Sequence, residues 1–127
     1  MYKIVIKGEA YTDYQDKSFF NGLDCQDEFS EYFDRVDEKA LIEKGVTDGY
    51  MSFKYDEELN KLFTITEYSS KEKLTSEELN ILGEYTQGQW SDGIGEGFEQ
   101  EPQYSDDDEE IYVSPWFDGQ QIEIIQS

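Results

Sequence analysis

Residues 49–68 read GYMSFKYDEELNKLFTITEY and predict a β-hairpin. Residues 49–55 and 61–68 are its two arms, in which successive side chains alternate between two faces with the period of a strand. Residues 56–60, which join the arms, are a typical short hairpin loop. We therefore expect a fold built around an antiparallel sheet that contains this hairpin.

Further strands are expected at both ends of the chain. In residues 2–11, hydrophobic and lysine side chains alternate, and the strand that they predict should lie inside the sheet rather than fray. Residues 111–117 and 120–126 predict a terminal hairpin around Asp118-Gly119, because Asp-Gly is a strong two-residue turn signal. Pro115 indicates that the first arm is an edge strand or is bulged. The sheet should therefore have about five strands.

Two helices are expected between the first strand and the central hairpin. Asp24 could cap the first of them, which would run to about Val36. Its apolar stripe consists of Phe29, Tyr32, Phe33 and Val36. Asp37 is placed to cap a second, short helix over residues 38–44 that ends at Gly45. The two could also be one kinked helix.

The third helix has the clearest start signal in the chain. Thr75 and Glu78 form the Thr-x-x-Glu pattern of a capping box, and Leu74 is placed to contact Leu79 as a hydrophobic staple. This helix should end near Gln87-Gly88. The expected fold is a single acidic α+β domain over residues 1–127, with element order β-α-α-β-β-α-β-β and helices packed on one face of the sheet.

Charge is the dominant feature of the composition. The chain has 31 acidic and 10 basic residues and no His, which gives a net charge of −21. Residues 1–73 contain 17 acids and all ten bases, so the other 14 of the 31 acids lie in residues 74–127 without a base. Such a chain repels nucleic acid and anionic membranes and attracts basic proteins. Its 16% aromatic content is enough for a core and argues against disorder.

Several kinds of chemistry are not expected. Without His, the usual general base and triad partner is missing, so we expect no enzyme and no catalytic residue. Cys25 is the only cysteine and cannot form an internal disulfide. Gly93, Gly95 and Gly97 do not match a nucleotide-binding fingerprint. Residues 106–110 carry carboxylates without the spacing of an EF-hand. We therefore expect no cofactor and no metal site. The first residues read neither as a signal peptide nor as a membrane span, so a cytoplasmic location is expected; the oligomeric state stays open.

Two acidic rows are the candidate sites for a basic partner. The first is one face of the expected first helix, continued at the start of the second, with Asp27, Glu31, Asp34 and Glu38. The second follows the third helix, with Asp92, Glu96, Glu99, Glu101, Asp106, Asp107, Asp108, Glu109, Glu110 and the aromatic anchor Tyr104. Trp90 and Phe98 are expected mainly in the core.

A resemblance implies a function for the protein as a whole. The run QWSDGIGEGFEQ at residues 89–100, the length, the acidity and the lack of His resemble small proteins of bacterial phages and mobile elements, some of which are anti-CRISPR proteins that inhibit Cas9. The composition is shared with other DNA mimics, such as anti-restriction proteins and glycosylase inhibitors. The resemblance implies an inhibitor that occupies a nucleic-acid site, for example the PAM-reading arginines or the guide-RNA channel of Cas9. The alternatives are a general acidic interaction module and a calcium-binding domain.

Overall fold

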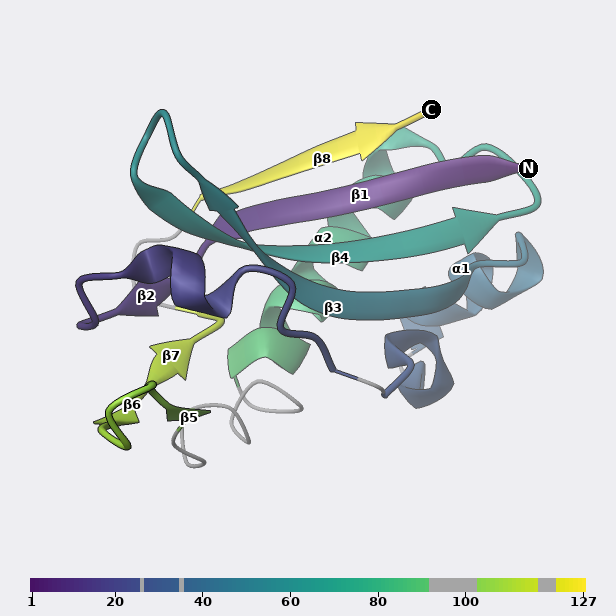
Figure 1. The fold of residues 1–127 in the computed structure, drawn as a ribbon. Coiled ribbons are helices and arrows are strands. Elements are labelled where there is room, and N and C mark those ends of the chain that lie inside the picture. The colour runs from purple at the N-terminus through teal and green to yellow at the C-terminus, as the bar shows by residue number, and fades with distance from the viewer. Residues whose placement is uncertain (26, 35, 92–102, 117–120) are drawn as a thin grey trace.

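The structure is a computed structural model that describes residues 1–25, 27–34, 36–91, 103–116 and 121–127. It has the expected α+β class, with helices on one face of a four-stranded antiparallel sheet (Figure 1). In spatial order the strands are β3 (Thr47–Asp56), β4 (Lys61–Ser70), β1 (Tyr2–Glu9) and β8 (Ile122–Gln126). The predicted central hairpin is confirmed as β3 and β4, and β1 lies inside the sheet as predicted.

The β3–β4 hairpin follows the alternation of its sequence. Met51, Phe53 and Leu62 point to the helix-covered face and are buried. The pairing is regular from Asp56↔Lys61 as far as Tyr50↔Glu67 and is then interrupted by a bulge between Asp48 and Tyr50. Gly49 lies in this bulge with a φ of +85°, a left-handed conformation in which glycine has no steric cost.

Helix α2 (Ser76–Ser91) covers this inner face of the sheet. Trp90 is fully buried, as predicted, and its Nε1–H donates to the Thr66 hydroxyl at 2.8 Å. The hydroxyls of Tyr68 and Thr86 lie 2.8 Å apart in the same interface. The helix continues to Ser91, beyond the predicted end near residues 87–88, because Trp90 adds one more turn of contact with the sheet. Buried polar groups are thus paired across the helix–sheet interface, as burial requires.

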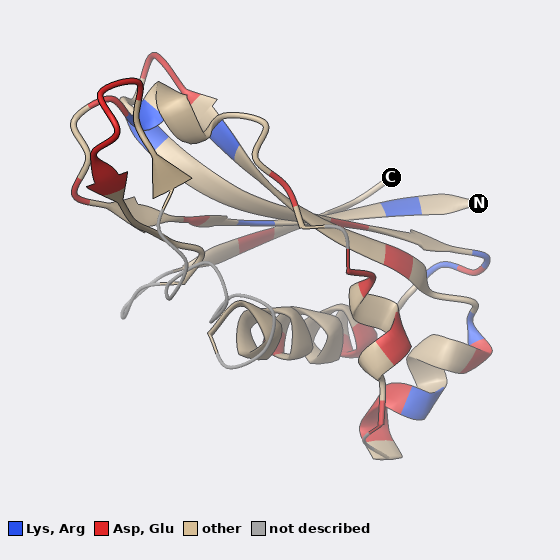
Figure 2. Cartoon of the chain, turned by 60° about the horizontal axis from the view of Figure 1, so that its bottom comes forward, with Lys and Arg blue, Asp and Glu red and all other residues tan. Residues whose placement is uncertain are grey.

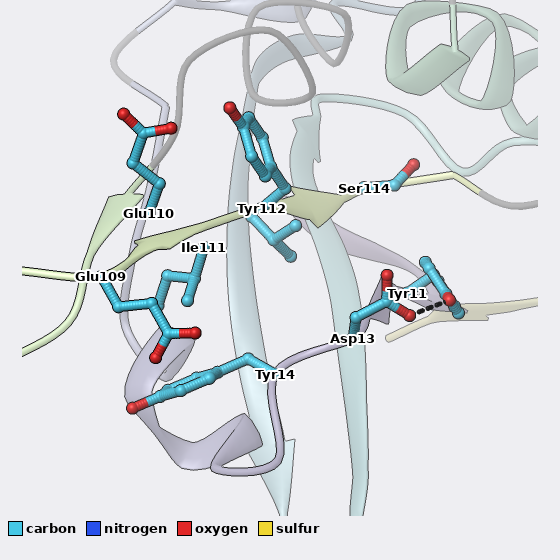
Figure 3. Close-up of a pocket in the computed structure, with 9 residues that line it drawn as sticks. Tyr11, Asp13, Tyr14, Glu109, Glu110, Ile111, Tyr112 and Ser114 are labelled. Carbon is cyan, nitrogen blue, oxygen red and sulfur yellow. Dashed lines mark hydrogen bonds between the residues drawn. The ribbon is translucent and has the colours of Figure 1, made fainter.

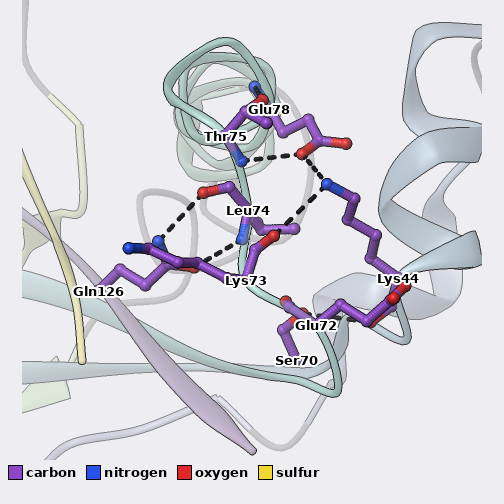
Figure 4. A network of polar contacts seen from close by, with 8 residues as sticks. All are labelled: Lys44, Ser70, Glu72, Lys73, Leu74, Thr75, Glu78 and Gln126. Carbon is purple, nitrogen blue, oxygen red and sulfur yellow. Dashed lines mark hydrogen bonds and ion pairs between the residues drawn. The ribbon is translucent and has the colours of Figure 1, made fainter.

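The start of α2 is fixed by the predicted capping box (Figure 4). Glu78 N–H donates to the Thr75 hydroxyl at 3.2 Å, and Thr75 N–H donates to the Glu78 carboxylate at 2.8 Å. Lys44 pairs with the same carboxylate at 2.5 Å. Partial burial opposes the charged form of Glu78, but the hydrogen bonds from Lys44 and Thr75 outweigh it and lower its pKa. The side-chain amide of Gln126 accepts a hydrogen bond from Leu74 N–H and donates one to Leu74 C=O, which connects β8 to the start of α2.

The helix predicted from Asp24 to Val36 is wrong. This region instead contains the short 3₁₀ helices η2 (Phe29–Tyr32) and η3 (Val36–Glu38), which follow η1 (Lys17–Phe20). The chain before η2 uses its backbone groups on the edge of β3: Gly22 N–H donates to Phe53 C=O, Phe53 N–H to Leu23 C=O, and Cys25 N–H to Met51 C=O. Groups paired in this way are unavailable to a helix. The second predicted helix is confirmed as α1 (Lys39–Glu43), which is followed by Gly45 at a φ of +76°.

The predicted terminal hairpin is also wrong. Its first arm divides into β6 (Glu110–Ile111) and β7 (Val113–Ser114), which pair with β5 (Gln103–Tyr104) and β2 (Tyr11–Thr12). Its second arm is β8, which pairs with β1. Residues 118–119, the predicted turn, lie outside the described residues. Pairing with β1 lets the side chains of Ile122 and Ile124 pack on Gly83 of α2, a contact that an isolated two-stranded hairpin lacks.

Candidate protein-binding surface

Five consecutive acidic residues occupy the loop between β5 and β6 and the first position of β6. We call residues 105–110 the acidic turn. Its exposed acids are Asp106, Asp107, Asp108, Glu109 and Glu110. Ser105 organises the loop: its N–H donates to Glu109 C=O at 3.0 Å, its C=O accepts from Asp108 N–H at 2.9 Å, and its hydroxyl accepts from Glu109 N–H at 3.2 Å. Asp108 takes a φ of +59°, which Asp tolerates better than most residues. The backbone is therefore fixed by hydrogen bonds, while residues 106–110 are exposed to solvent.

Tyrosines surround a hollow beside the acidic turn, which we call the tyrosine pocket (Figure 3). Its volume is about 350 Å³, and its walls include Tyr11, Tyr14 and Tyr112 together with Glu109 of the acidic turn. Tyr14 is held by edge-to-face contacts with Phe19 and Phe20, at centroid distances of 5.9 and 6.3 Å. The pocket thus places aromatic surface directly beside exposed carboxylates, a combination suited to the aliphatic stem and charged head of Arg or Lys.

Tyr11 is also bound to an acid within the tyrosine pocket. Its hydroxyl donates to the Asp13 carboxylate. This hydrogen bond, followed by the negative charge of Asp13, raises the pKa of Tyr11. Thr12, between the two, donates its hydroxyl to Tyr112 C=O at 2.7 Å and fixes the register of β2 against β7. Tyr104, predicted as an anchor, is 59% exposed on β5, opposite Glu110.

The predicted acidic helix face does not exist as one row. Because this region is not an α-helix, Asp27, Glu31 and Asp34 lie before, within and after η2 and are exposed. Glu38 is only 1% exposed, so its prediction as part of an exposed face is wrong. It lies at the end of η3, directly before α1, and η3 contacts both α1 and α2.

Three of these acids line a second hollow, which we call the acidic groove. This hollow of about 640 Å³ lies between the η2–η3 segment and α2, and Glu31, Asp34 and Glu38 meet Glu84 of α2 there. Tyr85 forms part of its wall, packs on Phe33 at a centroid distance of 4.7 Å, and donates its hydroxyl to Phe29 C=O. Burial, followed by the charges of Glu38 and Asp34, raises the pKa of Tyr85. Sequence reasoning missed Glu84, because nothing local relates it to residues 31–38.

Acidic residues gather in two separate parts of the described chain. Figure 2 shows them in the acidic turn at one end of the sheet and in the η2–η3 segment at the other end. Lys3 and Lys7 alternate with buried Ile4 and Ile6 on β1, so they point to the other, uncovered face of the sheet. There Lys3 pairs with Glu67 at 3.4 Å, and Lys7 lies over a phenylalanine ring. The uncovered face of the sheet thus carries basic side chains, which the acidic turn lacks.

Part of the predicted site lies outside the described residues, namely Asp92, Glu96, Glu99, Glu101 and the predicted core residue Phe98. Among the residues that are described, no three His, Cys, Asp or Glu side chains converge as metal ligands. None of the helices in that part of the chain is both long and apolar enough to span a membrane. No protein-family model, curated protein or solved structure matches this chain.

Proposed function

We propose that this protein inhibits a nucleic-acid-binding protein by placing its acidic turn in the basic cleft of that target. The observation that carries the proposal is the set of five exposed carboxylates on a backbone held by Ser105. Because the loop is preorganised, little of its conformational freedom is lost on binding. The neighbouring tyrosine pocket supplies the aromatic surface that protein interfaces favour.

The concentration of carboxylates supports nucleic-acid mimicry. Five consecutive acids are held in one short turn, so their negative charges lie close together, as the phosphates of a nucleic acid do. No lysine or arginine follows Lys73 in the sequence, so the neighbouring strands β5 to β8 add no positive charge of their own. A groove lined by Arg and Lys would therefore attract the negatively charged acidic turn, as it attracts the phosphates of nucleic acid.

The first target to test is a Cas9 nuclease, to which the resemblance of residues 89–100 points. In Cas9 the PAM-reading arginines and the heteroduplex channel are basic surfaces that an acidic protein can occupy. Occupation of either would stop target DNA from binding. Other nucleic-acid enzymes of host defence offer the same chemistry, and they form the comparison set.

The test is a competition experiment with labelled target DNA and the Cas9–guide complex. The test variant neutralises the acidic turn by Asp106→Asn, Asp107→Asn, Asp108→Asn, Glu109→Gln and Glu110→Gln. The control variant removes the same charge from five exposed acids elsewhere, by Glu43→Gln, Glu57→Gln, Glu58→Gln, Glu72→Gln and Glu77→Gln. Both variants have the same net charge, so they separate a local contact from the general field of the protein.

We expect the natural protein to displace DNA, the control variant to stay within several-fold of it, and the acidic-turn variant to lose at least about 100-fold in affinity, since truncation of desolvated charge pairs costs several kcal/mol. Raising NaCl from 50 to 200 mM should weaken binding, because exposed charges are screened. Equal losses in the two variants would refute the acidic turn as the contact. Binding without displacement of DNA would instead indicate a general interaction module.

A further inference from the structure

The two edges of the main sheet are treated differently. The β3 edge is covered by the chain around residues 22–25, which exchanges backbone hydrogen bonds with Phe53 and donates one to Met51 C=O. The β8 edge pairs only with β1 within the described part of the chain. β8 has no proline, no lysine and no bulge, the features that usually protect an exposed edge. Among the described residues, the sheet therefore has one covered edge and one open edge.

The register of β8 shows which of its backbone groups point outward. Lys3 and Ser127 exchange both of their backbone hydrogen bonds, each at 2.9 Å. Antiparallel pairs alternate between bonded and non-bonded positions, so the residues of β8 that bond inward are Ser127, Ile125 and Glu123. The N–H and C=O groups of Ile122, Ile124 and Gln126 consequently point away from β1. These three residues form a free ladder along the edge.

We propose that the occupant of this edge is a second copy of the chain, paired antiparallel through β8 about a two-fold axis at Ile124. In this register Ile124 faces Ile124 of the second copy and Ile122 faces Gln126, so every outward group of the free ladder gains a partner. On the uncovered face of the sheet, Glu123 of each copy lies opposite Ile125 of the other. Glu123, the only charged residue of β8, therefore does not lie opposite Glu123 of the second copy. A two-fold axis at Glu123 would instead place the two carboxylates side by side.

Two further observations favour self-pairing. The end of β8 is fixed by the bonds between Gln126 and Leu74, so the edge is preformed rather than ordered on binding (Figure 4). The face beside it carries Lys3 and Lys7, and Lys7 lies opposite Glu123 in the register of β1 and β8. Contact through the acidic turn or the acidic groove would instead bring like charges of two copies together, which the net charge of −21 makes unfavourable.

Salt dependence separates this association from target binding. Self-pairing brings together two molecules of like charge, so added salt should strengthen it. The proposed target contact joins opposite charges, so added salt should weaken that contact. The two proposals also rest on different residues, and the acidic-turn variant should self-associate at least as well as the natural protein.

The test uses two substitutions of Ile125, which is 49% exposed. In the proposed dimer, residue 125 of each copy lies opposite Glu123 of the other copy, so each substitution changes two cross-strand pairs. Ile125→Lys would create two pairs of opposite charge, and Ile125→Glu would create two pairs of like charge. Two cross-strand pairs of ordinary strength should lower the dissociation constant of the dimer roughly 2- to 30-fold in Ile125→Lys. Ile125→Glu should raise it by a similar factor. Analytical ultracentrifugation over a concentration series, at 50 and 500 mM NaCl, measures both.

Because the side chain at position 125 is partly exposed, both variants should retain the melting temperature of the natural monomer to within a few degrees. A dimer that is tightened by Lys, weakened by Glu and favoured by salt supports the proposal. The proposal is overturned if both the natural protein and Ile125→Lys stay monomeric at millimolar concentration. It is also overturned if the two substitutions change the dissociation constant equally, because the pairing would then lie elsewhere.

Discussion

Replacing Gly49 by alanine should destabilise the fold through two separate effects. At a φ of +85° an L-residue is strained, at a cost of about 1–2 kcal/mol. The added Cβ would also lie 2.5 Å from Cε1 of Tyr68 and 3.0 Å from Cβ of Phe29. Tyr68 is 1% exposed and its hydroxyl is held by Thr86, so its ring cannot move aside. Overpacking of this kind costs about 1–3 kcal/mol, so the total is about 2–5 kcal/mol.

Gly22 supplies the matched control. Its φ of +86° is nearly the same, and an added Cβ would meet nothing within 4 Å. Gly22→Ala should therefore lose only the conformational part, about 1–2 kcal/mol. Both substitutions restrict the unfolded chain equally, so their difference isolates the contact with Tyr68. Urea unfolding followed by tryptophan fluorescence measures both free energies. Equal destabilisation of the two variants would refute the packing argument.

Two further predictions concern the helix–sheet interface and the helix cap. Thr66→Val should lower the free energy of unfolding by about 1–3 kcal/mol, because it leaves the buried Trp90 Nε1–H without an acceptor. Thr66→Ser keeps the hydroxyl and should largely retain stability. Urea unfolding measures both variants, and equal losses would contradict the role of the hydroxyl. Glu78→Gln should lower stability at pH 7 relative to Glu77→Gln, its exposed neighbour. Because the pKa of Glu78 is lowered from its ordinary value of 4.5, this difference should be complete above pH 4.5 and disappear as the pH falls through the lowered pKa. A difference that persists at pH 2 would mean that the charge of Glu78 is not its cause.

Local signals predicted the parts of the fold that depend on local contacts. The alternation in residues 49–68 and the capping box at Thr75 are completed within a few residues, and both predictions are confirmed. The helix over residues 24–36 failed because Cys25 and its neighbours bond to β3, a partner far along the chain. Val36, counted in the apolar stripe, is 82% exposed. Apolar spacing alone therefore did not distinguish a helix from a chain anchored by single side chains such as Phe29.

The candidate site shows the same division. The run of acids at 106–110 was predicted to be solvated from its own repulsion, and its members are exposed. The tyrosine pocket was not predicted, because it requires β2 and β7 to meet, and the Asp-Gly turn signal favoured a different pairing for β7. The acidic groove likewise needs Glu84 from α2 beside Asp34. Sites assembled from distant segments need the tertiary fold before they can be recognised.

The central position of β1 has a consequence for how this protein is made. Ile4 pairs with Tyr68 on one side and with Gln126 on the other, so neither partner has left the ribosome when β1 emerges. Pairings between such distant segments form slowly, because the entropy of closing a long loop is lost before stabilising contacts form. The apolar side chains of β1 are therefore exposed during synthesis, when chaperones can bind them. The sheet is completed only after translation has passed residue 126.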